Sequence, residues 1–451
     1  EMEPGKIGIR REDKNIWERR APLSPKHVKA LVDQGLQVVV QPSSLRCFSN
    51  WQYKKAGAII QEDLSDCSLI MAVKEVPIEL LLPNRTYIFF SHTIKAQPYN
   101  MPLLDAILDK KIRLFDYEPI KDEESKRLVK FGPFAGLAGA IDSLHALGER
   151  LLYLGFSTPF LFISFSKFFA SLDIAFDAVK HAGEMILDRG LPEEILPLVF
   201  TCTSNGSVSK GAQEVLQKLP HKYVTVEELP TLEKDPHLVY ICEAKHYEYI
   251  VKSEDGSFDR EDYYANPELY ESKFHERVLP YTSVLLNCMY WDPRYPKIAT
   301  LEQMKKAKQE NLLKLLVLGD ITCDPNGSVE IFVRSTPIDN PVYAYDLDTD
   351  ETTPDGASVG HAPGIVVMGV DHLPAELPID ATNFFGDSFV SFVKNLAESD
   401  MRKPWGEQGL VRELEDACIA WNGHLTPNFE YIAELRARNE EAAASEEQSS
   451  S

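Results

Sequence analysis

The chain has 451 residues, of which 44% are apolar, and its 69 acidic and 47 basic side chains give a net charge of −22. This length and apolar content predict a large core divided between two or three domains. The strongly acidic balance disfavours nucleic acids and anionic membranes as partners, because both repel a negatively charged surface.

The N-terminal residues show neither a signal peptide nor an Arg-rich presequence. The 7 cysteines form no C-x-x-C pair, which favours a reduced compartment and disfavours a structural metal site. We therefore expect an intracellular protein that binds no metal, and the sequence does not choose between the cytoplasm and the mitochondrial matrix.

Residues 6–120 alternate short apolar runs with amphipathic segments, a pattern that predicts buried parallel strands in an α/β fold. A helix is expected after Ser24 as N-cap, with Pro25 in its first turn and Gly35 at its end. Three apolar runs end in titratable residues, namely Lys74 with Glu75, His92 with Lys95, and Asp116 with Glu118. Ligands of open α/β sheets bind beyond the carboxyl ends of the strands, so these residues mark a candidate site.

Lys74 and His92 are the candidates for acid/base chemistry. A lysine partly desolvated at a strand end has a lowered pKa and exchanges a proton more readily near neutrality, and histidine is the usual proton shuttle. Taken alone, each residue is also typical of a surface lysine or a structural histidine. A site is favoured because other charged residues fall at element ends of the same segment, namely Arg20, Lys95, Glu118 and Arg127.

The next segment, residues 131–155, is rich in glycine and alanine and predicts a closely packed helix. It overlaps the longest apolar run of the chain, residues 151–172. Because Gly155, Pro159 and Lys167 interrupt that run, we expect a buried element rather than a membrane span.

Residues 198–220 predict a strand, a tight turn and an amphipathic helix, which together have the shape of a dinucleotide-binding turn. Ser204 stands where the first glycine of that motif usually lies, while Gly206 and Gly211 remain. Taken alone, the resulting S-x-G-x-x-x-x-G pattern is more typical of a structural turn than of a cofactor site.

The strand predicted next, at 221–226, bears on the choice of cofactor. An NAD site usually places an acidic residue at the end of the following strand, but this strand ends near Thr225, with Glu227 and Glu228 only beyond it. Without an acid to repel a 2′-phosphate, the pattern favours NADP.

Further strands are expected at 237–244, 283–291, 312–322 and 364–373. Residues 254–280 are polar and aromatic and predict a long functional loop with one short helix. Helices are expected again at 379–398 and 409–421, and the acidic, low-complexity residues 439–451 predict a disordered tail or linker.

Seven motifs carry a family resemblance. They are RREDKNIWERRAPLSPKHV at 10–28, FFSHTIKAQPYNMPLLD at 89–105, FGPFAGLAGAIDSLHALGERL at 131–151, VSKGAQE at 208–214, PYTSVLLNCMYW at 280–291, GDITCDPNGSVEI at 319–331 and VDHLPAELP at 370–378. These motifs resemble the lysine–ketoglutarate reductase domain of bifunctional aminoadipic semialdehyde synthases, an NADP-dependent saccharopine dehydrogenase of the lysine-forming class. That family is similar to alanine dehydrogenase.

The resemblance implies an α/β fold of two Rossmann-like domains with the active site in a cleft between them. The implied substrate-binding and catalytic domain comprises residues 1–133 and 376–438. The implied NADP-binding domain comprises 134–375, and 439–451 form the tail. A covalently linked saccharopine-oxidising domain and self-association are left open by the resemblance.

The resemblance also implies a reaction, in which L-lysine and 2-oxoglutarate condense and are reduced by NADPH to saccharopine, the first step of lysine degradation. The lysine amine must first lose a proton against an ordinary pKa of about 10.4, which requires acid/base groups. The implied catalytic residues are Lys74, His92, Glu75 and Glu118. The implied substrate-binding residues are Arg20, Lys95 and Arg127, cations suited to the carboxylates of 2-oxoglutarate, and Asp324.

For NADP(H), the resemblance implies a binding set of Ser204, Asn205, Gly206, Ser207, Val208, Ser209, Gly211 and Asp320. The chain departs from the family at this turn, because relatives usually carry a G-T-G-N-V-S-like run. Ser204 costs little if its φ is negative and more if the turn requires a positive φ. Two alternatives therefore stay open, an NAD-dependent relative and a non-catalytic module of the same fold.

Overall fold

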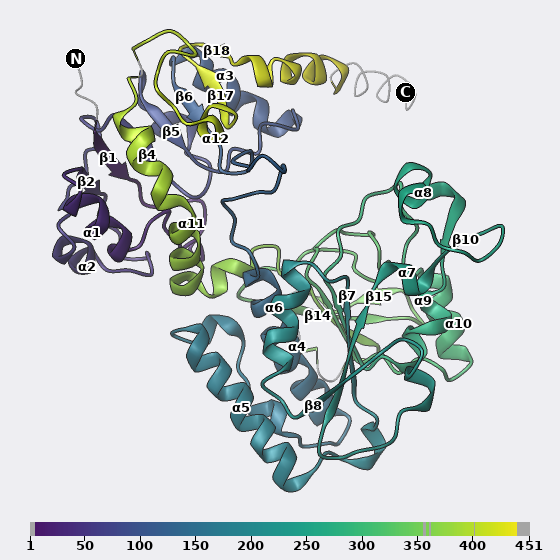
Figure 1. Cartoon of the computed structure of the whole chain (residues 1–451). Coiled ribbons are helices and arrows are strands. Elements are labelled where there is room, and N and C mark those ends of the chain that lie inside the picture. Colours follow the sequence, from purple (N-terminus) through teal and green to yellow (C-terminus); the bar gives the residue numbers. More distant parts are fainter. Residues whose placement is uncertain (1–4, 355–357, 360–361, 401, 440–451) are drawn as a thin grey trace. The chain divides into compact units, whose positions relative to one another are not determined.

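The structure is a computed structural model (Figure 1) that describes residues 5–354, 358–359, 362–400 and 402–439. The chain divides into two compact units, and each is described by itself. Unit 1 comprises residues 1–131 and 378–451, and unit 2 comprises residues 132–377. Within the described ranges, no helix is both long and apolar enough to cross a bilayer.

Unit 1 is built on an eight-stranded sheet with the order β18-β17-β6-β5-β4-β1-β2-β3. Its parallel strands are β1 (Lys6–Ile9), β2 (Gln37–Val40), β3 (Ile59–Ile60), β4 (Leu69–Met71), β5 (Thr86–Ile88) and β6 (Arg113–Phe115). The C-terminal part of the chain adds the antiparallel strands β17 (Cys418–Trp421) and β18 (His424–Leu425). The helices are α1 (Pro25–Asp33), α2 (Asn50–Lys55), α3 (Met101–Asp109), α11 (Pro378–Glu398) and α12 (Arg412–Glu415).

Both faces of this sheet are buried, because successive strand residues point to opposite sides. Val38 and Val40 of β2 pack into the core formed with α1 and α11, which includes Phe385. Val39 packs into the core formed with α3, which includes Leu104. The double coverage explains why the strands read as continuous apolar runs, and the yellow-green α11 lies beside the purple α1 (Figure 1).

The predicted helix after Ser24 is confirmed, since α1 begins at Pro25 and its N-cap Ser24 is extended. The backbone N–H of Ser24 donates to Nδ1 of His27 at 3.1 Å, which closes the first turn. The helix ends at Asp33, and Gly35 then takes a φ of +89°, a conformation that favours glycine.

Unit 2 is a second eight-stranded sheet, with the order β15-β14-β16-β13-β12-β7-β9-β8. Its parallel strands are β7 (Val199–Thr203), β8 (His221–Val224), β9 (Val239–Ala244), β12 (Val284–Asn287), β13 (Val317–Asp320) and β16 (Ile365–Met368). The antiparallel strands β14 (Val342–Asp346) and β15 (Glu351–Thr352) complete one edge, and β10 (Ile250–Lys252) pairs separately with β11 (Tyr270–Ser272).

The helices of unit 2 are α4 (Phe134–Tyr153), α5 (Leu172–Arg189), α6 (Ser207–Leu216), α7 (His246–Tyr249), α8 (Arg260–Ala265), α9 (Phe274–Arg277) and α10 (Leu301–Gln309). α4 and α6 pack closely because glycine faces backbone at their contact. A Cβ on Gly136 of α4 would lie 1.9 Å from the carbonyl oxygen of Val208, and one on Gly211 of α6 would lie 2.4 Å from that of Pro133. This packing fixes the position of the turn that precedes α6.

The strand order corrects the cofactor argument based on Thr225. β8 follows β7 in the chain, yet it lies at the edge of the sheet, and β9 is the strand that pairs with β7. The end of β8 is therefore not the strand end beside the turn. The residues that follow β9 take that position.

Three further segments differ from expectation. The helix predicted at 409–421 is wrong, because this range contains only the short helix α12, followed by the strand β17. Residues 254–280 are not a loop with one helix, because they include α8, β11 and α9, which are held by the buried side chains of Tyr263, Tyr270 and Phe274. In the apolar run, Phe160 is buried as expected, but other large side chains are not, including Phe162, Phe168 and Leu154. Of the predicted tail, only Asn439 lies within the described residues.

Candidate functional site

The carboxyl edge of the unit 1 sheet brings Lys74, Glu75 and His92 together. Lys74 and Glu75 follow β4 and His92 follows the neighbouring strand β5. Nδ1 of His92 lies 2.7 Å from Oε1 of Glu75, and Nζ of Lys14 donates to Oε2 of the same carboxylate at 2.7 Å. The amide of Asn100 donates to the backbone carbonyl of His92 at 2.9 Å and so holds its loop.

Charge and burial tune this group. Burial tends to raise the pKa of Glu75, but the hydrogen bonds from His92 and Lys14 outweigh it and lower that pKa to about 2. The pKa of Lys74 is lowered from its ordinary value by burial and then by the positive charge of Arg20. A lysine with a lowered pKa beside a histidine–carboxylate pair is an arrangement suited to proton transfer.

Arg20 is held by a buried acidic partner that the sequence analysis missed. Its Nε and Nη2 donate to the two oxygens of Glu18 at 2.8 and 2.6 Å, and its guanidinium lies 4.1 Å from the ring centre of Phe131. The side chains of Arg20 and Glu18 are almost fully buried. The pair places a fixed guanidinium near Lys74, and Glu18 keeps its own pKa low, because the charge of Arg20 and their hydrogen bonds outweigh burial.

A second residue that was missed, Glu12, fixes the backbone at the base of Lys74. Its carboxylate accepts the backbone N–H of Val73 at 2.6 Å and that of Lys74 at 3.0 Å. Burial, followed by the charge of Glu18, raises the pKa of Glu12 to about 7. The only signal in the sequence is an acidic residue just after the first strand, which is also typical of an exposed loop.

Glu12→Gln tests this contact through pH. Because the folded pKa of about 7 lies above the ordinary 4.5, the folded state keeps a proton that the unfolded state releases between those values. Wild-type stability therefore falls as pH rises through that window. We expect the decline in the free energy of unfolding, measured by urea titration, to be shallower in Glu12→Gln. The exposed control Glu79→Gln should decline like the wild type, and a decline equally steep in Glu12→Gln would contradict the assignment.

The predicted residues Glu118 and Arg127 form an ion pair at 3.6 Å. They line a pocket together with Lys121, Arg412 and Tyr431, whereas Glu75 lines a different pocket with Lys14 and Tyr99. Lys95 is exposed, three residues after His92. Asp116 is structural, because its buried carboxylate accepts from Ser91 and from the backbone of Glu118 and so joins the ends of β5 and β6.

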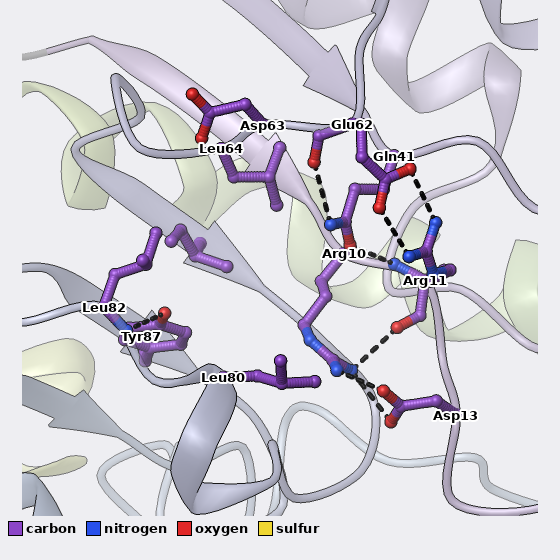
Figure 2. A pocket seen from close by; sticks show the side chains of 11 residues that line it. Arg10, Arg11, Asp13, Gln41, Glu62, Asp63, Leu64, Leu80, Leu82 and Tyr87 are labelled. Carbon is purple, nitrogen blue, oxygen red and sulfur yellow. Dashed lines mark hydrogen bonds and ion pairs between the residues drawn. The ribbon is translucent and has the colours of Figure 1, made fainter.

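Another pocket of unit 1 contains two arginines whose charges are already balanced (Figure 2). Arg10 pairs with Asp13, with Nη1 donating to Oδ1 at 3.1 Å, and Nη1 of Arg11 donates to Glu62 at 2.8 Å. Gln41 accepts from the backbone of Arg11 at the same place. Because Arg20 is likewise paired with Glu18, ion pairing does not by itself separate this pocket from the region around Arg20 and Lys74.

In unit 2, the turn between β7 and α6 has the form of a nucleotide cradle. Ser204 takes a φ of +67°, a left-handed backbone conformation that is strained for serine because its Cβ crowds the backbone. Its Oγ accepts the backbone N–H of Gly206 at 3.3 Å. A Cβ on Gly206 would meet open space, with Oγ of Ser204 nearest at 3.8 Å, and no side chain from the described residues caps the first turn of α6. Backbone N–H groups at such a helix start suit a phosphate group.

The cofactor residues predicted from the motif differ in position. Asn205, Gly206 and Ser207 are exposed, whereas Ser209 is buried and its Oγ accepts the side-chain amide of Gln213 at 3.1 Å. Gly211 serves helix packing, as described above. The direct phosphate cradle is thus reduced to the exposed start of the turn and helix.

Asp320 lies at the end of β13 and is fully buried. It accepts from the amide of Asn287 at 3.1 Å and from Oγ1 of Thr322 at 2.6 Å, and burial raises its pKa to about 6. Oγ1 of Thr203 donates to Asn287 at 3.0 Å, so the network joins the ends of β13, β12 and β7. Asp324 follows four residues later and is half-buried. No described group of three or more His, Cys, Asp or Glu residues is arranged to hold a metal.

Comparison with known proteins shows which proteins the chain is similar to. The chain is 42% identical to alpha-aminoadipic semialdehyde synthase of Arabidopsis thaliana over 97% of its own length and 42% of that protein, and 40% identical to the mitochondrial protein of that name from Bos taurus, over 97% and 48%. Over almost its whole length the chain is thus similar to part of these two proteins. It spans about half the length of these relatives. A saccharopine dehydrogenase [NAD(+), L-lysine-forming] of Schizosaccharomyces pombe is 24% identical over 88% of the chain and 95% of that protein.

The family model of the alanine dehydrogenase/PNT N-terminal domain matches residues 8–138 of the chain. Among solved structures, an L-alanine dehydrogenase aligns with a TM-score of 0.59 at 16% identity, covering 95% of the chain and 99% of that protein. A transhydrogenase from Sinorhizobium meliloti aligns with a TM-score of 0.50 at 13% identity, covering 93% and 100%. These alignments confirm the predicted fold class of two Rossmann-like α/β domains.

Proposed function

We propose that this chain catalyses the reductive condensation of L-lysine with 2-oxoglutarate to saccharopine, with NADPH as the reductant. The observation that carries the proposal is the group of Lys74, Glu75 and His92 on unit 1, held beside Arg20. The names of the full-length relatives agree with this chemistry. In this proposal unit 1, with boundaries close to 1–133 and 376–438, is the substrate-binding and catalytic domain, and 134–375 is the cofactor domain.

The proposed roles follow from the proton balance. The ε-amine of lysine loses a proton and attacks the ketone carbon, and the hydroxyl then leaves as water. A bound nicotinamide would supply the hydride that reduces the resulting imine carbon. Lys74, with its lowered pKa, accepts the amine proton, and His92, oriented by Glu75, returns a proton to the departing oxygen.

Substrate binding is assigned to the cations of unit 1. The guanidinium of Arg20 is fixed by Glu18, and Arg127 and Lys95 offer further positive charge for a dicarboxylate. Glu118 pairs with Arg127 and sets its direction. Asp324 is assigned to the ammonium of the lysine substrate. In unit 2 the cofactor phosphates are assigned to the start of the turn and helix, from Ser204 to Ser207, while Ser209 and Gly211 serve the packing of α6 and Asp320 joins the neighbouring strand ends.

A coupled test separates this proposal from its alternatives. The absorbance of NADPH should fall when the chain is mixed with NADPH, lysine and 2-oxoglutarate together. It should stay constant when lysine or 2-oxoglutarate is omitted, and no reaction is expected without NADPH. A faster reaction with NADH would instead identify an NAD-dependent relative. The strained backbone of Ser204 favours a second candidate function, a non-catalytic module of the same fold. Calorimetry that finds a folded chain binding neither NADPH nor NADH would support this second candidate.

The setting of the reaction is also a proposal. The relatives from Bos taurus and Mus musculus are mitochondrial by name, so we propose an intracellular location, with matrix and cytoplasm still to be distinguished. Because those relatives are about twice as long as this chain, a linked saccharopine-oxidising domain is a natural partner.

A further inference from the structure

The order of the strands in unit 2 points to one residue beside the dinucleotide turn. β9 pairs with β7 in parallel, with Thr203 opposite Ala244. The backbone N–H of Ser204 donates to the carbonyl oxygen of Ala244 at 3.0 Å. The register therefore places the next residue, Lys245, at the level of Ser204, on the carboxyl edge of the sheet.

This position has a defined meaning in dinucleotide folds. The side chain at the end of the strand beside the glycine turn meets the adenosine ribose, where an acid accepts the 2′-hydroxyl of NAD and a nearby cation accommodates the 2′-phosphate of NADP. At the corresponding place this chain carries Lys245, an ammonium group. Chain order alone hides it, because β8 comes first in the sequence but lies at the sheet edge.

The local structure holds Lys245 in place at the end of β9. Its backbone N–H donates to Oε2 of Glu248 at 2.7 Å, which fixes the main chain where β9 meets α7. About a third of its side chain is exposed (35%), and Nζ forms an ion pair with Oε1 of Glu243 at 3.7 Å, a distance too long for a hydrogen bond. The ring centre of Tyr247 is 5.9 Å from the same nitrogen.

Glu243 is the competing residue, because a carboxylate near the ribose would favour NADH. Its other oxygen, Oε2, accepts the side-chain amide of Gln213 in α6 at 2.8 Å. Glu243 lies within β9, two residues before Lys245, so both side chains point to the α6 side and Lys245 stands nearer the edge. The side chain of Lys245 is the more exposed of the two, at 35% against 25% for Glu243.

We propose that Lys245 binds the 2′-phosphate of NADPH and thereby sets the cofactor preference of this chain. The assignment rests on the proposed function in one respect, namely that the turn after β7 binds a nicotinamide dinucleotide. A charge-assisted contact of this kind is worth roughly 10- to 100-fold in affinity.

The test measures binding rather than turnover. Isothermal titration of the full chain with NADPH, NADH, adenosine 2′,5′-bisphosphate and AMP would be repeated with Lys245→Ala, Lys245→Arg and Glu243→Gln. Lys222→Ala removes an exposed lysine from the edge strand β8 and serves as the matched control. Thermal unfolding of each variant shows that the fold is retained.

We expect Lys245→Ala to weaken the binding of NADPH and of the bisphosphate by roughly 10- to 100-fold and to leave the affinity for NADH within about twofold of the wild type. Lys245→Arg should bind NADPH like the wild type, and Lys222→Ala should not change any of these affinities. Unchanged NADPH affinity in Lys245→Ala, or equal weakening of both dinucleotides, would overturn the assignment alone. A NADH-specific loss in Glu243→Gln with no effect in Lys245→Ala would transfer the role to Glu243. A folded wild-type chain that binds neither dinucleotide would overturn the proposed function as well, so the two failures are distinguishable.

Discussion

Lys74→Met and His92→Gln should each lower turnover by roughly 10²- to 10⁴-fold, the usual contribution of a positioned acid or base. Lys74 has its pKa lowered by burial and by Arg20, and Met keeps its length while removing the proton-carrying nitrogen. His92 would lose the ring nitrogen that meets Glu75 at 2.7 Å. The measurement is initial rate against substrate concentration, across pH, for each variant.

The matched control for this pair is Lys26→Met, which removes an exposed lysine of α1 that pairs with Asp387. It should turn over at the wild-type rate. If Lys74→Met and His92→Gln both stay within a few-fold of the wild type at every pH, the acid/base assignment is wrong and the group at this sheet edge has another role.

Gly136→Ala should destabilise unit 2 by about 1–3 kcal/mol or more, the cost of overpacking. The added Cβ would lie 1.9 Å from the carbonyl oxygen of Val208 and 2.8 Å from the backbone nitrogen of Ala212, both in α6. Neither neighbour is a flexible side chain, so α4 and α6 must move apart. The free energy of unfolding from urea titration measures this loss, and NADPH titration shows whether the turn before α6 moves with the helix.

Gly206→Ala is the control for that substitution, because it adds the same methyl group to the turn. Gly206 has a φ of −73° and the nearest atom to its new Cβ is 3.8 Å away, so stability should change little. Equal stability of Gly136→Ala and the wild type would show that the α4–α6 contact is looser than the structure indicates.

The fold class followed from the sequence because buried parallel strands leave apolar runs that are easily recognised. The strand order did not, since neighbours in a parallel sheet need not be consecutive in the chain. The amino-acid sequence did contain one sign of this order. β8 has the sequence HKYV and begins with two polar residues, whereas β9 has the more apolar sequence VYICEA. In the structure only Val224 of β8 is buried, as suits an edge strand, whereas most of β9 is buried, as suits an interior strand. That difference decides which residue stands beside the turn.

Lys74 and His92 of the candidate site could be predicted because each follows an apolar run that indicates the end of a strand. Glu12 and Glu18 were missed because they lie in an irregular segment without periodicity, and the partners of Glu12 are 61 and 62 residues away in the chain. From the sequence, the cost of serine at position 204 depended on whether its φ is negative or positive. The structure gives a φ of +67°, the strained case. The assigned roles of these residues stay predictions.

The most direct test of the central claim is isotope transfer into the product. The chain would be incubated with lysine, 2-oxoglutarate and NADPH carrying deuterium at the transferable position of the nicotinamide, and the products analysed by mass spectrometry. The account predicts saccharopine that carries one deuterium, at the carbon bonded to the new nitrogen. With Lys74→Met the same product should form roughly 10²- to 10⁴-fold more slowly. Folded wild-type chain that binds NADPH yet forms no labelled saccharopine would contradict the account.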